Sequence, residues 1–338
     1  MVFQPYVPEY ALRLLADHGG EAPPFARWTD AAVLFVDVAG FTPMSASLAA
    51  AGTYGAEELS DLLNAVLDRV TGLVGGYGGT VAKFAGDAVT AVFTASGRAW
   101  GNAARRAVQC ALDLQAAMGE LRAVTTRAGT FTLAMRAGVG AGRVLLAVVG
   151  DQEVRLEHLV AGEAVGRAAD AVRHAGPGEV AVDGALARAI AVEARERRGT
   201  AVVASRLARR PRRPPSRPPA GVAGPTDERL AAFLHPAIAE RIRRGQSRLV
   251  NEHRTVTVAF IALPNPMELG RLQRYVAAAV RTIARWDGHL RQVDLGDKGS
   301  VLVVAFGAPL RHENHEERAV RCCRVVATPL YAREANQS

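Results

Sequence analysis

The stretch Gly79-Thr80-Val81-Ala82-Lys83-Phe84-Ala85-Gly86-Asp87, followed by the apolar run 88–93, says more about the fold than any other part of the chain. Two short apolar segments around a turn that contains glycine are typical of a β-hairpin. The same arrangement returns at residues 288–306, where Gly296-Asp297 lies 210 residues after Gly86-Asp87. A pattern that recurs at this distance predicts two copies of one structural unit.

Other segments recur in the same order. The apolar strand 32–36 returns at 257–261, and Arg106-Ala107-Val108-Gln109-Cys110 returns as Arg318-Ala319-Val320-Arg321-Cys322. The segment before the first strand also has a counterpart, since Tyr6-Val7-Pro8 resembles residues 233–236. The first copy continues well beyond Cys110, whereas the second stops soon after Cys322, so we expect the second copy to be incomplete.

Hydrophobic periodicity gives a coarse structure for the first copy. Strands are predicted at 31–37, 80–84, 88–94, 157–161 and 179–182, helices at 56–74, 99–118 and 163–174, and a hairpin over 131–150 that turns at Gly140-Ala141-Gly142. The order β-α-β-β-α-β is that of the ferredoxin-like unit. The predicted fold class is therefore α+β, with two ferredoxin-like domains in tandem and the second truncated.

The chain divides into four predicted parts. These are a lead-in at 1–27, a first domain at 28–205, a linker at 206–226 and a partial second domain at 227–338. The stretch 206–219 contains six arginines, five prolines and no acidic residue. Because proline fixes φ and removes a hydrogen-bond donor, this stretch is expected to be an extended, semi-rigid spacer. An anionic partner such as nucleic acid is the less favoured interpretation.

Composition excludes several classes of protein. The 338 residues are 49% hydrophobic and 22% charged, which is typical of a globular protein. The net charge is +8, and without the six arginines of the linker it falls to 8 − 6 = +2, so neither domain is strongly basic. No apolar run is long enough to cross a bilayer. The absence of a secretory leader and the three cysteines favour the cytosol.

Two aspartates lie where chemistry is expected. Asp37 ends an apolar strand and precedes a glycine turn at Gly40, and Asp87 lies at the tip of the hairpin. In the ferredoxin-like order this strand and this hairpin are neighbours, so the two carboxylates can meet. Two carboxylates with phosphate oxygens are the ligands that Mg²⁺ uses at nucleotide sites. Lys83 is one of only two lysines, the other being Lys298, which suggests a role that arginine cannot fill.

Residues 35–42 and 79–88 resemble the two metal-binding signatures of class III nucleotidyl cyclases. Two unequal copies on one chain are most similar to the tandem catalytic domains of soluble, bicarbonate-responsive adenylyl cyclases. This resemblance implies an active site between two cyclase homology domains, where ATP is converted to cyclic AMP and pyrophosphate. It covers residues 28–200 and, more weakly, 250–330.

The resemblance also implies roles for individual residues. Asp37, Asp87 and the Val38 carbonyl would hold two Mg²⁺ or Mn²⁺ ions. The N–H groups of Gly40, Phe41 and Thr42 would bind phosphate, and Lys298 of the second copy would contact the purine. Lys83 and Arg155 would form a small-anion site for bicarbonate.

The chain departs from the family pattern at three points. Gly166 and Asp170 occupy the positions of the family's transition-state Asn and Arg, and Ala262 replaces the first aspartate in the second copy. The chain also ends at Ser338, before the second copy's Asn and Arg could occur. We therefore expect ATP binding with poor turnover. A catalytically silent ATP-binding regulatory module remains an alternative, and a nucleic-acid-associated protein that uses the arginine linker is a weaker one.

Overall fold

The computed structural model describes residues 1–94, 100–119, 123–212, 224–246, 255–263, 268–296 and 299–331. Contacts within the chain divide it into two compact units. The first unit consists of Trp28–Val144 and Ala161–Pro218, and the second of Met1–Arg27, Leu145–Val160 and Pro219–Ser338. The first unit contains the first copy of the repeat, and the second unit contains the second copy.

The first unit is built on a mixed sheet with the strand order β2-β3-β1-β6-β8-β10-β9. The strands are β1 (Phe25–Ala39), β2 (Thr80–Ala85), β3 (Ala88–Thr94), β6 (Ala134–Asp151), β8 (Val180–Asp183), β9 (Val192–Arg198) and β10 (Ala201–Leu207). β1 pairs antiparallel with β3, and Val36 lies opposite Val89. The predicted hairpin at the Gly86-Asp87 turn is confirmed, and so is its position beside the first strand. A separate two-stranded sheet joins β4 (Ala123–Thr126) and β5 (Gly129–Thr132).

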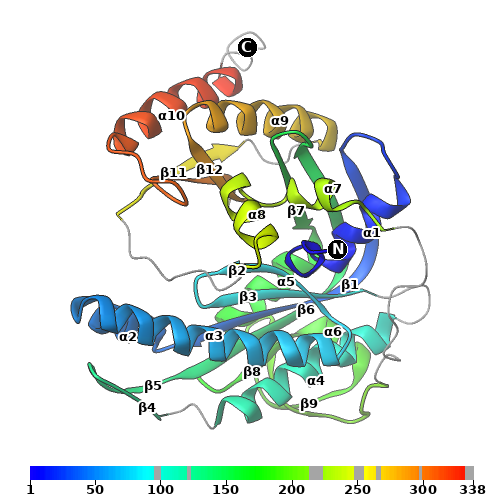
Figure 1. Cartoon of the computed structure of the whole chain (residues 1–338). Coiled ribbons are helices and arrows are strands. Elements are labelled where there is room, and N and C mark those ends of the chain that lie inside the picture. The colour runs from blue at the N-terminus through cyan, green and yellow to red at the C-terminus, as the bar shows by residue number, and fades with distance from the viewer. Residues whose placement is uncertain are drawn as a thin grey trace. The chain divides into compact units, whose positions relative to one another are not determined.

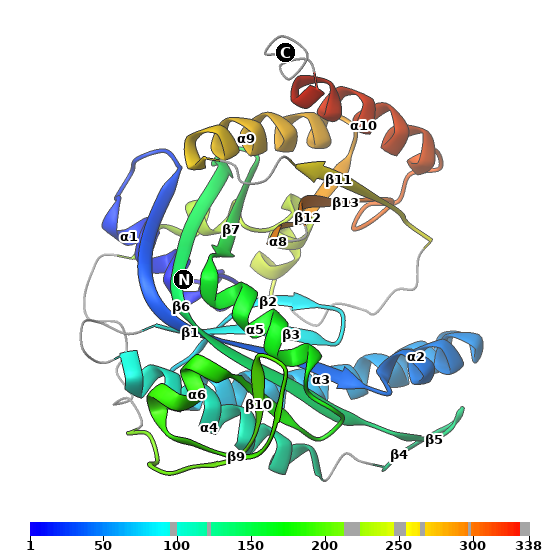
Figure 2. The ribbon, with the colours of Figure 1, turned by 180° about the vertical axis from the view of Figure 1, so that it is seen from behind.

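Helices cover both faces of this sheet. The long α3 (Thr53–Gly76) and α4 (Trp100–Met118) lie on one face (Figure 1), and α5 (Glu163–Arg173) lies on the other (Figure 2). Two shorter helices, α2 (Phe41–Ala50) and α6 (Gly184–Ile190), complete the unit. The predicted helices and the predicted strands of the first copy therefore form, with ends shifted by a few residues.

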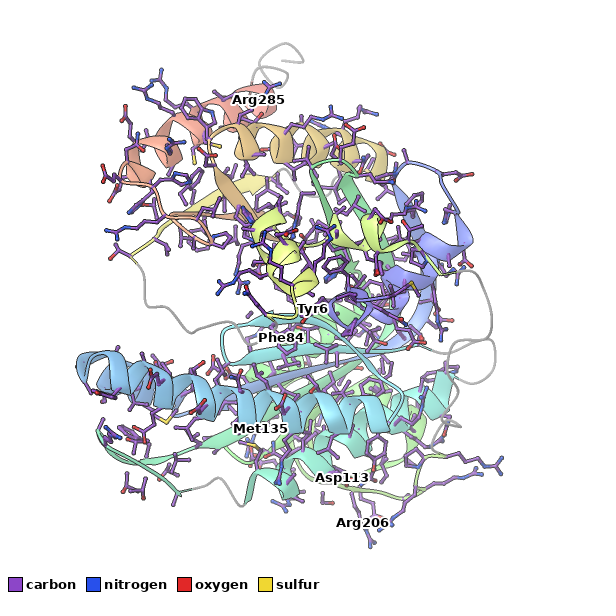
Figure 3. The ribbon with its side chains drawn as sticks, viewed as in Figure 1. Tyr6, Phe84, Asp113, Met135, Arg206 and Arg285 are labelled. Carbon is purple, nitrogen blue, oxygen red and sulfur yellow. The ribbon has the colours of Figure 1, made fainter. Side chains whose placement is uncertain are left out.

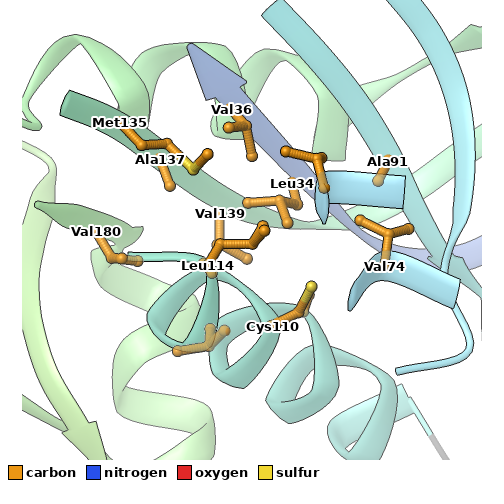
Figure 4. Close-up of a cluster of buried hydrophobic side chains, with 14 of the residues drawn as sticks. Leu34, Val36, Val74, Ala91, Cys110, Leu114, Met135, Ala137, Val139 and Val180 are labelled. Carbon is orange, nitrogen blue, oxygen red and sulfur yellow. The ribbon is translucent and has the colours of Figure 1, made fainter. Parts of the chain in front are cut away.

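The core of the first unit lies between the sheet and the α3–α4 layer. Leu34 and Val36 of β1 alternate with residues that face away, and they pack with Cys110 and Leu114 of α4 (Figure 4). This period-two alternation is what a strand covered by helices on one face requires. It leaves the odd-numbered residues of β1, among them Asp37, on the opposite face.

The predicted turn at Gly140-Ala141-Gly142 is wrong, because β6 is one uninterrupted strand from Ala134 to Asp151 (Figure 2). Its glycines serve the packing of α5 instead. A Cβ on Gly138 would lie 2.4 Å from the backbone nitrogen of Val172, and one on Gly140 would lie 2.4 Å from that of Ala168. The glycines thus allow a helix to approach the strand closely, which is a second common use of glycine in strands.

The second unit has a smaller, three-stranded antiparallel sheet of order β11-β13-β12. Its strands are β11 (Thr257–Leu263), β12 (Gly288–Gly296) and β13 (Gly299–Phe306), and its larger helices are α9 (Leu269–Arg285) and α10 (His315–Tyr331). The lead-in η1 (Gln4–Tyr6) and α1 (Glu9–Asp17), strand β7 (Arg155–Ala161), α7 (Asp227–Ala231) and α8 (Pro236–Arg243) complete the elements that belong mainly to it. By their contacts, residues 145–160 group with this unit rather than with the first copy.

The beginning of the arginine-rich linker is held by hydrogen bonds. The Asn102 side chain donates to the Arg212 carbonyl at 3.1 Å and accepts from the Arg212 N–H at 3.0 Å. Arg206 extends outward from β10 (Figure 3) and pairs with Glu193 across the β9–β10 hairpin. Residues 213–223 lie outside the described residues, so the predicted extended spacer stays a prediction there. No helix in the described ranges has the length and apolar character needed to cross a membrane.

Candidate metal and nucleotide site

Two strands bring Asp37 and Asp87 together. The pairing of β1 with β3 ends at Val36 opposite Val89, so Asp37 is one residue further along, beside the start of β3. Asp87 precedes β3 in the two-residue turn after β2, where Gly86 has a φ of 65°. Both carboxylates are partly exposed at this end of the sheet. The expectation that they meet at one site is consistent with this register.

The pKa of Asp87 also indicates that the two carboxylates lie close together. Its pKa is raised, first by partial burial and then by the negative charge of Asp37, while its own backbone N–H and the guanidinium of Arg136 act in the opposite direction. Like charges that share a site favour protonation of one of them. The two acidic groups are thus close enough for the charge of Asp37 to act on Asp87.

Arg136 of β6 is a third charged group at the site, and the sequence analysis did not single it out. Its Nε donates to Oδ2 of Asp37 at 3.1 Å, and a second guanidinium nitrogen contacts the same oxygen. The side chains are 41% and 30% exposed. The signal in the sequence was an arginine between Met135 and Ala137, which are both buried in the core, so that Arg136 must point to the opposite face.

The turn after β1 is shaped by Gly40. Its φ is 90°, and a Cβ at this position would lie 2.3 Å from the carbonyl oxygen of Thr132, so only glycine fits. Gly40 is also the N-cap residue of α2 and offers no side chain to the first N–H groups of that helix, at Phe41 and Thr42. Backbone N–H groups at the start of a helix are suited to a phosphate.

The remaining predicted residues are more scattered. The Val38 side chain is buried in the core, so its carbonyl is the group left for a metal. Lys83 lies on β2 in the first unit, whereas Arg155 belongs to the second unit, where it contacts the Phe233 carbonyl and Glu157. The Arg155 side chain is 15% exposed. Lys298 lies outside the described residues.

The α5 helix carries the two positions at which the sequence departs from the cyclase pattern. Gly166 has no side chain, and Asp170 bonds to the Thr200 hydroxyl and to Arg173 at 2.5 Å. These contacts, the hydroxyl first, hold the pKa of Asp170 below its usual value. A carboxylate fixed in this way cannot stabilise the negative charge that develops on a phosphate.

The donor set at Asp37 and Asp87 fits a hard divalent cation. Within the described ranges no three His, Cys, Asp or Glu side chains come together, so a soft or all-protein metal centre is not formed there. Two carboxylates and a carbonyl leave several positions for phosphate oxygens and water, which is how Mg²⁺ is usually held. These residues would hold the ion only with help from a ligand.

Comparison with known proteins places the chain in a family. The family model described as the adenylate and guanylate cyclase catalytic domain matches residues 25–206. The chain belongs to this family. The match includes β1, the β2–β3 hairpin and α5, so the cyclase resemblance of the sequence is confirmed for the first copy. Residues 207–338, with the second copy, lie outside the matched range.

Curated relatives agree with this assignment. Adenylate cyclase type 10 of Rattus norvegicus is 31% identical over 144 residues, which are 42% of this chain and 9% of the relative. The same enzyme of Homo sapiens is 30% identical over 150 residues, 44% of this chain and 9% of the relative. The chain thus matches only a small part of the length of these proteins.

Solved structures similar to the chain at low identity include several cyclases. The adenylyl cyclase CyaB from P. aeruginosa is 22% identical, covers 54% of this chain and 97% of its own, and has a TM-score of 0.45. A bacterial light-regulated adenylyl cyclase is 20% identical, covers 61% of this chain and 59% of its own, and has a TM-score of 0.46. Guanylyl cyclase domains are found as well, one of them in complex with GTP.

Proposed function

We propose that this chain is a nucleotidyl cyclase that binds ATP with two Mg²⁺ or Mn²⁺ ions and forms cyclic AMP and pyrophosphate. The observation that carries the proposal is the pair of Asp37 and Asp87 at one end of the sheet, next to the glycine turn that starts α2. The choice of ATP over GTP rests on the adenylate cyclase relatives, since both adenylyl and guanylyl cyclases occur among the similar structures.

The chain's residues would act by holding and orienting the nucleotide. Asp37, Asp87 and the Val38 carbonyl would bind the metals, and the N–H groups of Gly40, Phe41 and Thr42 would donate hydrogen bonds to the phosphate oxygens. When bound, the ions lower the pKa of the ribose 3′-hydroxyl and neutralise the β- and γ-phosphates. The 3′-hydroxyl would give its proton to water, its oxygen would bond to the α-phosphorus, the bond from the α-phosphorus to the bridging oxygen would break, and pyrophosphate would leave.

The second copy is proposed to be a cyclase homology domain that pairs with the first within the chain. Its topology repeats that of the first copy, but Ala262 stands where the first copy has Asp37. Lys298 would contact the purine. The transition-state Asn and Arg are absent from the first copy, and losing such a charge stabiliser typically costs a factor of about 10²–10³. Slow turnover is therefore expected.

The proposal is tested by nucleotide binding and product formation in parallel. Purified chain with Mn²⁺ should bind ATP and form cyclic AMP slowly, and Asp37→Asn or Asp87→Asn should weaken binding and abolish product. Asp68→Asn, which changes a carboxylate on the exposed side of α3, is the matched control. Binding and product that are indifferent to both aspartates would contradict the proposal.

A second candidate is an ATP-binding regulatory module that performs no chemistry. The observation that favours it is Asp170, which is bonded to Thr200 and Arg173 where the family has its catalytic arginine. This candidate predicts metal-dependent ATP binding that needs Asp37 and Asp87, together with no cyclic AMP over hours of incubation. The parallel assay separates the two candidates directly.

The bicarbonate site expected at Lys83 and Arg155 stays a prediction. The two residues belong to different units, and Arg155 has partners within its own unit. Bicarbonate titration at fixed pH, with chloride as the control anion, tests the idea. Activation that is lost in both Lys83→Ala and Arg155→Ala supports the site, and activation that survives both removes it.

A further inference from the structure

The helix α9 of the second copy carries a row of arginines on its exposed side. Its apolar side packs into the core of the second unit, whereas Arg271, Arg274, Arg281 and Arg285 are all exposed. Separations of three, four and seven residues return to the same side of a helix, so the four side chains form one row about 21 Å long. The helix contains no acidic residue, and its charge is +4.

Little of this charge is balanced at close range. The Arg281 guanidinium contacts Asp151, and within the described ranges no ion pair is found for Arg271, Arg274 or Arg285. Glu268, the residue before α9, uses its carboxylate to cap the helix, since it accepts hydrogen bonds from the N–H groups of Gly270 and Arg271. Most of the row is therefore available to an anionic partner outside the chain.

The corresponding helix of the first copy has the opposite charge. In the repeat, α3 takes the place of α9. It contains one basic residue and four acidic residues, so its charge is 1 − 4 = −3; these are Arg69, Glu57, Glu58, Asp61 and Asp68. Both helices pack an apolar side into the core of their own unit. The arginine row is therefore specific to α9 and is not required by the repeated fold.

The neighbouring helix α10 extends the same surface. α9 contacts β12, α10 contacts β11 and β13, and the two helices contact each other, so they cover one face of the sheet side by side (Figure 1, Figure 2). Their outer sides therefore face the same way. On the outer side of α10, Val320 is 63% exposed, and Arg324 and the ion pair of Arg321 with Glu317 lie near it in the helix. The layer thus presents a row of positive charge beside an exposed apolar side chain.

We propose that the outer side of α9, together with the adjoining side of α10, binds an anionic membrane surface. Negatively charged headgroups attract clusters of arginine on an exposed helix, and a layer of two helices side by side suits a flat surface. An apolar side chain such as Val320 adds to this binding by entering the headgroup region. The proposal concerns a surface of the second copy and does not depend on Asp37, Asp87 or a bound nucleotide.

The experiment measures cosedimentation of the full chain with vesicles of equimolar phosphatidylcholine and phosphatidylserine. The chain should bind these vesicles at low ionic strength and not vesicles of pure phosphatidylcholine, and added salt should weaken the binding. The triple variant Arg271→Gln, Arg274→Gln and Arg285→Gln should bind about a hundredfold more weakly, because each arginine near an anionic surface contributes about a factor of five. Val320→Ser should weaken binding less, by about threefold.

The matched control is the triple variant Arg195→Gln, Arg197→Gln and Arg206→Gln. It removes the same charge from exposed positions of the β9–β10 hairpin in the first unit. It should bind the vesicles like the unchanged chain. An equal loss in both triple variants would show that net charge alone decides the binding, and this result would overturn the proposal. So would an unchanged chain that does not bind the anionic vesicles at low ionic strength.

Lysine at the three positions of α9 separates lost binding from lost folding. Arg271→Lys, Arg274→Lys and Arg285→Lys together keep the charge, so this variant should bind the vesicles like the unchanged chain. The melting temperatures of the glutamine and lysine variants should agree, since exposed side chains contribute little to stability. Loss of binding in the lysine variant would contradict a partner recognised by charge and would overturn the proposal.

A nucleic acid is the other polyanion that such a row could bind. A duplex oligonucleotide is therefore titrated against the same variants by fluorescence anisotropy. Duplex binding that is lost in the glutamine variant of α9, without binding to phosphatidylserine vesicles, would assign the row to nucleic acid and overturn the proposal. Asp37→Asn and Asp87→Asn should bind the vesicles like the unchanged chain, which separates this surface from the proposed nucleotide site.

Discussion

The two copies of the repeat share one topology and differ in what surrounds it. The first copy is β1, α3, β2, β3 and α4, with the strand order β1-β3-β2; the second is β11, α9, β12, β13 and α10, with the order β11-β13-β12. In the first unit, β6 pairs with the free side of β1. In the second unit, β11 is at the edge of its sheet as far as the described residues go, and Phe260 on it is 71% exposed.

This difference shows which features are specified by the repeated sequence itself and which depend on the elements packed around each copy. The strand order and the glycine before each hairpin are present in both copies. Among the described residues, the core beyond α4 is found in the first copy, where α4 packs against β8, β10 and α6. The candidate metal ligand also differs between the copies, because the first has Asp37 where the second has Ala262. Matched substitutions in the two copies can therefore test each part separately.

The largest loss of stability is expected at the glycine before the hairpin, which both copies share. A Cβ on Gly79 would lie 2.6 Å from the ring of Phe93, and a Cβ on Gly288 would lie 2.6 Å from the ring of Phe306. Both rings are almost fully buried. Gly79→Ala and Gly288→Ala should each lower the free energy of unfolding by about 3 kcal/mol, as overpacking does. Urea denaturation measures this, with Gly75→Ala, which meets nothing within 4 Å, as the control.

The next prediction concerns the arginine of the repeated Arg-Ala-Val motif, whose removal should cost more stability in the first copy than in the second. Arg106 is buried and donates to the carbonyls of Tyr77, Gly78 and Thr94. Arg106→Ala leaves these groups unpaired, so a loss of about 2 kcal/mol is expected. Its counterpart Arg318 is 28% exposed and bonds to Asn314 and Asp287.

Arg318→Ala should therefore cost less than about 1 kcal/mol. Equal losses of unfolding free energy in the two variants, measured by the same urea titration, would show that the repeat position and not its surroundings sets the stability.

The repeat explains why so much of the fold could be predicted. A hairpin with a glycine turn, an apolar strand and a helix with inward residues every three or four positions are local patterns, and each occurs twice. The error at Gly140-Ala141-Gly142 has the opposite origin. Glycine that ends a strand and glycine that lets a helix approach look the same in sequence, and only the position of α5 over β6 distinguishes them.

The site was predictable to a similar extent. Asp37 stood out because it ends an apolar strand before a glycine turn, and Asp87 because it lies at the tip of the hairpin. Arg136 did not, because its partner is 99 residues away and only the pairing of β1 with β6 brings the two together. Charged groups that act across a sheet leave a weak local signal, which here was an arginine between two apolar residues, Met135 and Ala137.

The third prediction concerns acid. Two partly buried histidines lie in the second unit, and loss of hydration is the main reason for the pKa of His158 falling to about 4 and that of His289 to about 3. The unfolded chain takes up these protons near pH 6.5, whereas the folded chain does not. The contribution of each histidine is thus complete above pH 6.5 and is lost as the pH falls towards its folded pKa.

The loss is at most about 1.4 kcal/mol per pH unit for each histidine. From pH 7 to pH 5 the free energy of unfolding of the second unit should fall by about 2 kcal/mol for each of the two histidines. Hydrogen exchange of peptides over 155–161 and 288–296 locates the effect. His158→Gln, which loses the neutral imidazole at the Tyr10 hydroxyl, should flatten the slope, whereas His174→Gln in the first unit should not. An unchanged slope in His158→Gln would contradict the assignment.

The smallest expected loss of stability concerns the valine of the Arg-Ala-Val motif. It allows the most direct comparison of the two copies, because both have the same residue at the same position. Val108 is fully buried in the core cluster that includes Leu186 and Ile190, whereas Val320 is 63% exposed. Val108→Ala removes packed methyl groups and should cost about 1 kcal/mol, and Val320→Ala should change stability by less than about 0.5 kcal/mol. Thermal and urea unfolding of both variants provide the test. A cost at Val320 as large as that at Val108 would mean that this face of α10 is covered in solution, and size-exclusion chromatography of the chain would then show whether a second copy covers it.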